Sequence, residues 1–361
     1  MPTVSFLIPI YNVEDYLAEC LDSAKNQTFE DIEVICINDG STDGSRDIIE
    51  RYVQSDPRFR VIDKPNSGYG ASMNMGLAEA KGKYIAILES DDIYGHSSLE
   101  HLVSVAEAND AQVVKGDFWL YWSKPQPKRV QFGLVDDDMT GKVYDTRAGH
   151  PIYYRKPSIW SAIYRRDFLE ENQIDFLETP GASYQDTSFS FKVWACASRV
   201  VFSTQPTLSY RQDNESSSVN SPKKAYCVCG EYSEMERFLK ANPEKRAKLE
   251  GLKERMKYDS YMWNYERLSD DIRDDFLLYF RNEMADDIIA GDLDVSYFES
   301  WAIADLQLLL KSPEKFDQFR DKYASDNKLD VLRRYLNIGG VPLVMQMLKE
   351  KINRQLGGAG K

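Results

Sequence analysis

The residues with the clearest capacity for chemistry follow a short apolar stretch in YIAILESDDIYG, residues 84–95. Glu89, Asp91 and Asp92 come directly after what reads as a buried strand. Carboxylates crowded at such a place repel one another and lose hydration, so their presence needs compensation. A hard divalent cation, Mg²⁺ or Mn²⁺, prefers oxygen ligands and also recruits phosphate. The segment therefore predicts a metal site that holds a diphosphate.

A further carboxylate, Asp39, ends a second apolar strand in INDGSTDGS, residues 37–45. Taken singly, either motif is explained equally well as a strand end followed by a helix cap. Ligands of α/β proteins bind beyond the carboxyl ends of parallel strands, which meet at one edge of the sheet. We therefore expect Asp39, Asp91 and Asp92 to lie close together in a binding site.

The elements that must position these carboxylates alternate between strand and helix over the first 122 residues. Apolar, β-branched runs predict strands at 4–11, 32–39, 59–64, 83–90 and 111–122. Helical patterns fill the intervals, and Asn12 is expected to cap the first helix. This alternation predicts an α/β fold with a Rossmann-like, mostly parallel sheet and flanking helices.

The pattern changes after residue 123. Residues 124–145 read as a hairpin or loop, 158–172 as a strand and a helix, 183–198 as a helix, and 199–212 as one or two strands. A loop composition at 213–222 predicts a boundary between a domain at 1–218 and a C-terminal all-helical region at 219–361. That region is expected to hold helices at roughly 222–242, 244–264, 270–290, 296–311, 313–323, 328–337 and 341–356.

Composition limits the partners. The chain has 361 residues, with 45 Lys and Arg against 58 Asp and Glu, a net charge of −13. This balance disfavours a nucleic-acid partner and electrostatic docking of the whole chain on an anionic membrane. Three histidines exclude a His-rich metal site, and five unpatterned cysteines indicate free thiols. With no apolar run of transmembrane length and no signal-peptide core, we expect a cytoplasmic protein.

Several segments, in their order along the chain, resemble the inverting, GT-A-fold glycosyltransferases of family 2. They span about three-fifths of the chain, residues 1 to 218. The segments are VSFLIPIYNVEDYLAECLDSAKNQTF, IEVICINDGSTDGS, NSGYGASMNMGLAEAKGKYIAILESDD, SIWSAIYRRDFL, YQDTSFSFKVWA and SYRQDNESSS. The resemblance implies a nucleotide-sugar donor, an acceptor hydroxyl on a glycan or a lipid-linked glycan, and a role in cell-surface polysaccharide or glycoconjugate synthesis.

The resemblance also implies a nucleotide site. Pro9 and Tyr11 resemble the positions that wall the base. Asp39 resembles the carboxylate that reads the uracil imide, which favours a UDP-sugar donor. Three positions resemble the turn and helix start beside the nucleotide and donor sugar: Asn66, Gly68 and Asn74.

The metal motif and a phosphate contact follow from the same resemblance. Asp91 and Asp92 match the pair that binds the ribose and a Mn²⁺ or Mg²⁺ ion, and Asp92 is the expected direct ligand. Glu89 stands where the family often has Asp. Arg211 is the candidate phosphate contact, because a guanidinium fits phosphate oxygens. The family's His in this loop is replaced here by Gln or Asp, which weakens the case that the loop ligates metal.

The expected catalytic base is Asp186 in SYQDTSF, where the family usually has Glu-Asp and this chain has Gln185 and Asp186. Loss of the neighbouring charge should make Asp186 more acidic and so a weaker base. From the residues alone, Asp186 is better explained as the N-cap of the helix that follows, and the resemblance is what favours a base. As a base it would accept the proton of the attacking hydroxyl, and a single displacement would invert the anomeric carbon.

Three questions stay open in the sequence. Trp160 either stacks on an acceptor sugar or packs in the core. Residues 341–356 form an amphipathic segment, with Val344, Met347 and Leu348 on one face, that either contacts a membrane surface or packs against protein, in an oligomer or within the chain. Two other functions stay possible: a catalytically silent sugar-nucleotide-binding module and a sugar-1-phosphate nucleotidyltransferase. A nucleotidyltransferase would need a Gly-rich, Arg-containing loop after the first strand, and this sequence has none there.

Overall fold

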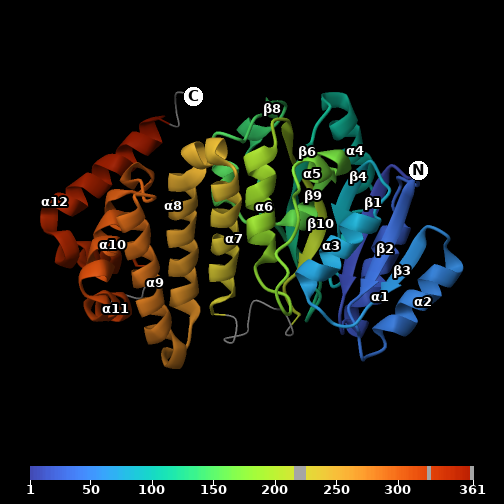
Figure 1. The fold of residues 1–361 in the computed structure, drawn as a ribbon, viewed down its shortest axis with the longest axis horizontal. Helices are drawn as coiled ribbons and strands as arrows, with labels where there is room; N and C mark the ends of the chain where they lie inside the picture. The colour runs from blue at the N-terminus through green and yellow to red at the C-terminus, as the bar shows by residue number, and fades with distance from the viewer. Residues whose placement is uncertain (215–224, 323–326, 358–361) are drawn as a thin grey trace. The chain divides into compact units, whose positions relative to one another are not determined.

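The computed structural model describes residues 1–214, 225–322 and 327–357, except for the side chains of 271 and 354–357. The chain divides into two compact units (Figure 1). The first comprises Met1–Ser221 with Gly230–Ala241, and the second comprises Pro222–Cys229 with Asn242–Lys361. Most of helix α7 (Cys227–Ala241) thus groups with the first unit, although the sequence placed it in the C-terminal region.

One mixed sheet forms the centre of the first unit. Its main path, among the described residues, has the order β3-β2-β1-β4-β9-β6-β10-β5. The strands of this path are β1 (Val4–Ile10), β2 (Ile32–Asn38), β3 (Phe59–Asp63), β4 (Tyr84–Ile87), β5 (Ile93–Tyr94), β6 (Val113–Trp122), β9 (Ala162–Arg165) and β10 (Val200–Arg211). Two short strands extend it, β7 (Lys128–Gln131) beside β6 and β8 (Val143–Tyr144) beside β10. Of the hairpin or loop expected after residue 123, the antiparallel pair of β6 and β7 is the hairpin.

The direction of the strands decides where their ends meet. β1 runs parallel to β2 and β4, β2 runs parallel to β3, and β6 runs parallel to β10. β9 is antiparallel to both β4 and β6, so it joins the two parallel halves without reversing them. The carboxyl ends of these six parallel strands therefore lie at one edge of the sheet, the edge at which the sequence predicted a site.

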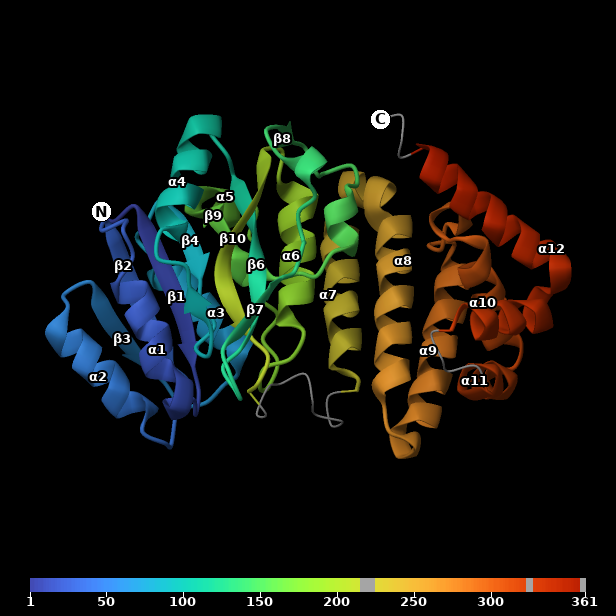
Figure 2. The ribbon, with the colours of Figure 1, turned by 180° about the vertical axis from the view of Figure 1, so that it is seen from behind.

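Seven helices of the described residues belong wholly or mostly to the first unit: α1 (Glu14–Lys25), α2 (Ser45–Ser55), α3 (Tyr69–Glu79), α4 (Ser98–Asn109), α5 (Arg166–Glu171), α6 (Gln185–Cys196) and α7. α3 packs on β1 and β2, where Gly76 lies against Leu7 and Ile37. α6 and α7 run side by side in both views (Figures 1 and 2). Asn12 does not cap α1, because its side chain accepts a hydrogen bond from the backbone N–H of Thr42.

The second unit is helical where it is described. Its helices are α8 (Pro243–Arg267), α9 (Asp270–Ala290), α10 (Ser300–Lys311), α11 (Pro313–Lys322) and α12 (Lys328–Gly357). Tyr258, Tyr261 and Phe280 are buried in its core. α12 bends at Gly340, whose φ of 68° is outside the helical range, and this explains why the sequence indicated two helices there. Among the described residues, no helix has both the length and the apolar character needed to cross a membrane.

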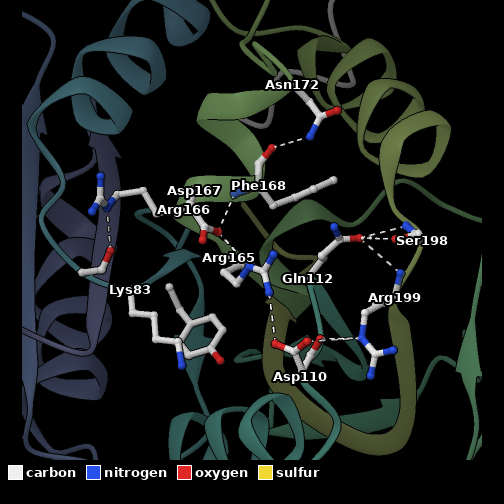
Figure 3. Close-up of polar contacts among 12 residues, drawn as sticks. Lys83, Asp110, Gln112, Arg165, Arg166, Asp167, Phe168, Asn172, Ser198 and Arg199 are labelled. Carbon is white, nitrogen blue, oxygen red and sulfur yellow. Dashed lines mark hydrogen bonds and ion pairs between the residues drawn. The ribbon is translucent and has the colours of Figure 1, made fainter.

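The amino-terminal edge of the sheet is held by a polar network (Figure 3). The side-chain oxygen of Gln112 accepts hydrogen bonds from the backbone N–H groups of Ser198 and Arg199 at 2.8 and 3.2 Å. Arg165 pairs with Asp110 at 3.2 Å, and Arg199 donates to the carbonyl of Asp110. These contacts join the starts of β6 and β10 to the end of β9, so the network serves the fold.

Candidate active site

Asp39 connects two of the loops at the carboxyl edge. Its carboxylate is 5% exposed and accepts hydrogen bonds from the backbone N–H of Ser67 at 2.8 Å and of Gly68 at 3.0 Å. The ammonium of Lys64 also contacts it. Both oxygens therefore hold the β3–α3 loop against the end of β2. Reading of a uracil imide by Asp39 stays a prediction.

The chain's own backbone lies close against the glycines at the start of α3, where a Cβ would not fit. A Cβ on Gly68, which has a φ of +94°, would lie 2.4 Å from the carbonyl oxygen of Thr179. A Cβ on Gly70 would lie 2.1 Å from the carbonyl oxygen of Leu177. Asn74 exchanges two hydrogen bonds with the backbone of Phe176, at 2.8 and 2.9 Å. The close approach expected for a substrate is thus made by residues 176–181, which lead to Asp186.

The other positions predicted for the nucleotide differ in exposure. Pro9 is buried within β1, beside Ile37 of β2. Tyr11 is 52% exposed just beyond the end of the same strand, and Asn66 is exposed in the β3–α3 loop. Tyr11 and Asn66 are therefore accessible to a ligand, whereas Pro9 can act only by shaping the strand end.

Asp92 is fully buried after β4. One of its oxygens accepts a hydrogen bond from the backbone N–H of Arg211 at 2.8 Å, and the other, Oδ2, has no hydrogen-bond partner among the described residues. Burial raises the pKa of Asp92 well above its usual range, and the charge of Asp91 raises it further. Asp91 is partly buried and accepts a hydrogen bond from the side chain of Asn214 at 2.7 Å.

These carboxylates fit a divalent cation of the Mg²⁺ or Mn²⁺ type. Such an ion is commonly held by one or two carboxylates together with water and substrate phosphate. The unpartnered Oδ2 of Asp92 is an oxygen ligand of this kind. The described residues contain no group of three or more His, Cys, Asp or Glu side chains that could hold a metal by themselves. The arrangement therefore suits an ion completed by phosphate, and it does not suit a closed protein cage.

Arg211 is engaged within the protein. Its Nη2 donates to Glu19 at 2.6 Å and its Nε donates to the backbone carbonyl of Asp91 at 2.8 Å. The guanidinium also lies over the rings of Tyr16 and Tyr121, 4.7 and 5.1 Å from their centroids. Its side chain is 2% exposed. In this structure Arg211 positions the acidic pair; the phosphate contact predicted for it would require it to leave Glu19.

Asp186 is the second residue of α6. The interpretation of Asp186 as an N-cap is wrong, because Tyr184 occupies the cap position. Gln185 holds the preceding loop: its amide donates to Thr179 at 2.8 Å and its oxygen accepts from the backbone N–H of Ser183 at 2.5 Å. The carboxylate of Asp186 takes no part in holding this loop. Among the described residues, the one side chain that donates a hydrogen bond to it is that of Thr187, at 3.4 Å.

The surroundings of Asp186 set its proton affinity. Burial raises the pKa of Asp186, whereas the charges of Lys156 and, less strongly, Lys115 lower it. The charge lost at Gln185 predicted a more acidic Asp186, whereas burial of the carboxyl group acts in the opposite direction. Lys115 is 1% exposed, donates to the side chain of Ser158 at 2.8 Å, and has its pKa lowered by burial to about 7.

Three neighbours of Asp186 were not found from the sequence: Lys115, Lys156 and Glu231. Glu231, on α7, is 1% exposed and accepts a hydrogen bond from the backbone N–H of Ser188 at 3.1 Å. A lysine inside the apolar run AQVVKGDFW was a usable signal for Lys115. No sequence signal pointed to Glu231, because the sequence assigns its helix to the C-terminal region.

Trp160 belongs to the core. It is 5% exposed, stacks on Tyr210 with ring centroids 4.9 Å apart, and meets Phe118 edge to face at 4.6 Å. The structure therefore favours the packing interpretation of Trp160 over an exposed platform for a sugar. Tyr210 carries Lys156 on its ring, with Nζ 4.8 Å from the centroid.

The fold and the acidic edge define a GT-A type α/β protein, and the comparisons show which known proteins it is similar to. Residues 5–171 match the model described as glycosyl transferase family 2. It is 31% identical over 221 residues to the uncharacterized glycosyltransferase EpsJ of Bacillus subtilis, covering 60% of this chain and 63% of EpsJ. It is 28% identical over 216 residues to the glycosyltransferase GlyA of Streptococcus pneumoniae, covering 58% of this chain and 30% of GlyA. The match thus spans less than two thirds of these relatives.

Solved structures share the fold over more of the chain. TarS 1–349 of S. aureus superposes with a TM-score of 0.61 at 20% identity, covering 88% of each chain. A structure of the same protein in complex with UDP-GlcNAc gives a TM-score of 0.63 at 21% identity. These likenesses extend beyond residue 171, where the family model ends.

Proposed function

We propose that the protein is an inverting, metal-dependent glycosyltransferase that moves a sugar from a UDP-sugar to an acceptor hydroxyl on a glycan or lipid-linked glycan. One observation carries the proposal. Burial raises the pKa of Tyr210, and four carboxylates, those of Glu89, Asp91, Asp92 and Asp186, raise it further, so the acidic pair and the candidate base share one neighbourhood. The match of residues 5–171 to family 2 and the UDP-GlcNAc complex of TarS support a UDP-sugar as the first donor to test.

In the proposed reaction the acceptor oxygen attacks the anomeric carbon from the face opposite the diphosphate. The new C–O bond forms as the bond between the anomeric carbon and the diphosphate oxygen breaks, and UDP departs with that electron pair. Asp186 takes the hydroxyl proton, which is worth roughly 10²–10⁴-fold for a well-placed base. Because burial raises its pKa, Asp186 is a stronger base than a solvated aspartate.

Asp92, with Asp91 beside it, would hold the Mn²⁺ or Mg²⁺ ion. When bound, such an ion supplies Lewis-acid stabilisation of charge on the leaving diphosphate. The chain prepares this position through Arg211, whose backbone N–H fixes one oxygen of Asp92 and whose side chain holds the carbonyl of Asp91. Tyr69 donates to Glu89 at 2.6 Å and so fixes the third acidic side chain.

A catalytically silent sugar-nucleotide-binding module is the second candidate, and the replacement of the family's Glu by Gln185 favours it. The hydrogen bonds of Gln185 to Thr179 and Ser183 give that replacement a structural purpose instead. The nucleotidyltransferase alternative has no comparable observation in its favour.

The test is release of UDP from UDP-sugars with Mn²⁺, with EDTA, and with candidate acceptors. We expect slow metal-dependent donor hydrolysis, lost in Asp92→Asn and in Asp186→Asn. Asp63→Asn is the matched control, because Asp63 is an exposed carboxylate at the end of β3 on the same sheet edge. Tight, metal-enhanced binding of UDP in calorimetry, with no turnover of any donor, would instead establish the silent module.

A further inference from the structure

Exposed apolar side chains gather on α12, which is red in Figures 1 and 2. Seven large apolar residues of this helix are exposed by 39% or more: Leu329, Leu332, Leu336, Val341, Met345, Leu348 and Ile352. Their spacing is three or four residues within each half of the helix, on either side of the bend at Gly340. Each half therefore carries one continuous apolar stripe on its solvent side.

The same helix packs on its unit through a different face. Tyr335 is 4% exposed and donates to Asp305 of α10, and Val344 is 8% exposed. Glu350 accepts a hydrogen bond from the hydroxyl of Ser300 at 2.9 Å. The sequence placed Val344 and Leu348 on the same face of this helix. Packing within the second unit buries Val344 but leaves Leu348 49% exposed.

The charges beside the stripe are basic. At 100° per residue, Lys349 and Lys351 lie on either side of the stripe in the second half of α12, and Lys328 and Arg333 do so in the first. Residues 328–357 contain six Lys and Arg against two acidic residues, in a chain whose net charge is −13. The helix is therefore positively charged on an otherwise acidic protein.

We propose that α12 docks on an anionic lipid bilayer, with its apolar stripe at the acyl boundary and its flanking Lys and Arg side chains at the headgroups. An apolar stripe edged by basic residues is the pattern of helices that lie in the plane of a membrane interface. Long basic side chains reach the headgroups while their stems cover apolar surface. The negative surface of such a bilayer complements the local charge of α12 and not that of the whole chain.

A second copy of the chain is a poorer occupant of this face. Helices that pair through an apolar seam usually place opposite charges on its two sides. Pairing α12 with another α12 would bring Lys349 and Lys351 toward the basic residues of its twin. The membrane proposal does not rest on the proposed enzymatic function.

The test is co-sedimentation of the full chain with vesicles of phosphatidylcholine, with or without phosphatidylglycerol. We expect binding to the anionic vesicles, weakened by high salt, and little binding to the neutral ones. The double variant M345S/L348S should lower the partition coefficient about tenfold or more, because two apolar side chains no longer enter the bilayer.

Ile289→Ser is the matched control, since Ile289 is 83% exposed on α9 and outside the stripe. Unchanged circular dichroism and melting temperature show that both variants are folded, and both substitutions remove only exposed side chains. Equal vesicle binding by wild type and M345S/L348S, or no binding to anionic vesicles, would overturn the proposal. So would a dimer in sedimentation velocity that M345S/L348S converts to monomer, because a second copy would then be the occupant. Since no assay of transfer is involved, either result leaves the proposed function untouched.

Discussion

The carboxylate of Glu231 on α7 accepts a hydrogen bond from the backbone N–H of Ser188 on α6, two residues beyond Asp186. The first turn of a helix has N–H groups without intrahelical partners, so this contact fixes the turn that carries the candidate base. Burial raises the pKa of Glu231 to about 8, and the charge of Asp186 contributes to the increase, whereas Lys192 opposes it. A helix from beyond the matched family segment thus shapes the site.

Glu231→Gln should make stability less dependent on pH. A glutamic acid whose pKa rises from about 4.5 unfolded to about 8 folded stabilises the protein fully below the lower value and loses this contribution as pH rises through the higher one. Gln keeps the acceptor for Ser188 and does not ionise. We expect similar melting temperatures at pH 5 and a variant several degrees more stable than wild type at pH 8.5, by about 1–3 kcal/mol.

The control for this prediction is Glu30→Gln, which changes an exposed carboxylate of the same unit. Its melting temperature should follow that of wild type at both pH values. A Glu231→Gln variant that is less stable than wild type at pH 8.5 would show that the carboxylate is ionised and paired when folded.

Lys156→Met should move the acid limb of kcat/KM to higher pH. The charge of Lys156 lowers the pKa of Asp186 more than that of Lys115 does. Without it, Asp186 holds its proton to higher pH and is active as a base only above it. We expect the acid limb to move upward, because the positive charge that favours the ionised form of Asp186 is removed. The exposed Lys142→Met serves as control, and an unmoved limb would argue against Asp186 as the base.

Gln185→Glu should restore the Glu-Asp pair that is usual in the family and lower the stability of this chain. A carboxylate at 185 loses the amide donor to Thr179 and lies close to the carbonyl of Gly181, which Gln185 now contacts at 3.3 Å. We expect a loss of about 1–3 kcal/mol in the free energy of unfolding and an acid limb shifted upward by the added charge. Gln205→Glu, at an exposed position, should change neither. Higher activity with unchanged stability would contradict the structural purpose assigned to Gln185.

Gly70→Ala should lower both stability and activity. Its Cβ would meet the carbonyl oxygen of Leu177 at 2.1 Å, so the segment that leads to Asp186 must move. We expect a loss of about 1–3 kcal/mol, measured by denaturant unfolding, despite the better helix propensity of Ala. Gly230→Ala is a matched change in α7, where the nearest atom is 3.8 Å away, and it should be neutral or stabilising by up to about 1 kcal/mol. Equal effects of the two changes would refute the packing argument.

Periodicity predicted the first strands and helices well, because local patterns of apolar residues determine them. It could not predict that β9 lies between β4 and β6, since pairing with strands more than 45 residues away leaves no local signature. The same limit applies to the site. Asp39, Asp91 and Asp92 could be singled out because they follow strands. The contacts of Gly68, Gly70 and Asn74 could not be predicted, because they are made with a segment about 100 residues further along the chain.

Because β9 comes late in the chain, it is synthesised after β4 and β6, the two strands between which it lies. Until residues 162–165 leave the ribosome, β4 and β6 each lack the neighbour that joins them. Unpaired strand edges invite association with other chains, so nascent chains that stall in this interval are the ones most exposed to aggregation. Shorter versions of the domain that stop at the fifth predicted strand would carry this defect permanently, and expression trials should therefore begin with chains that extend through α7, which belongs mostly to the first unit.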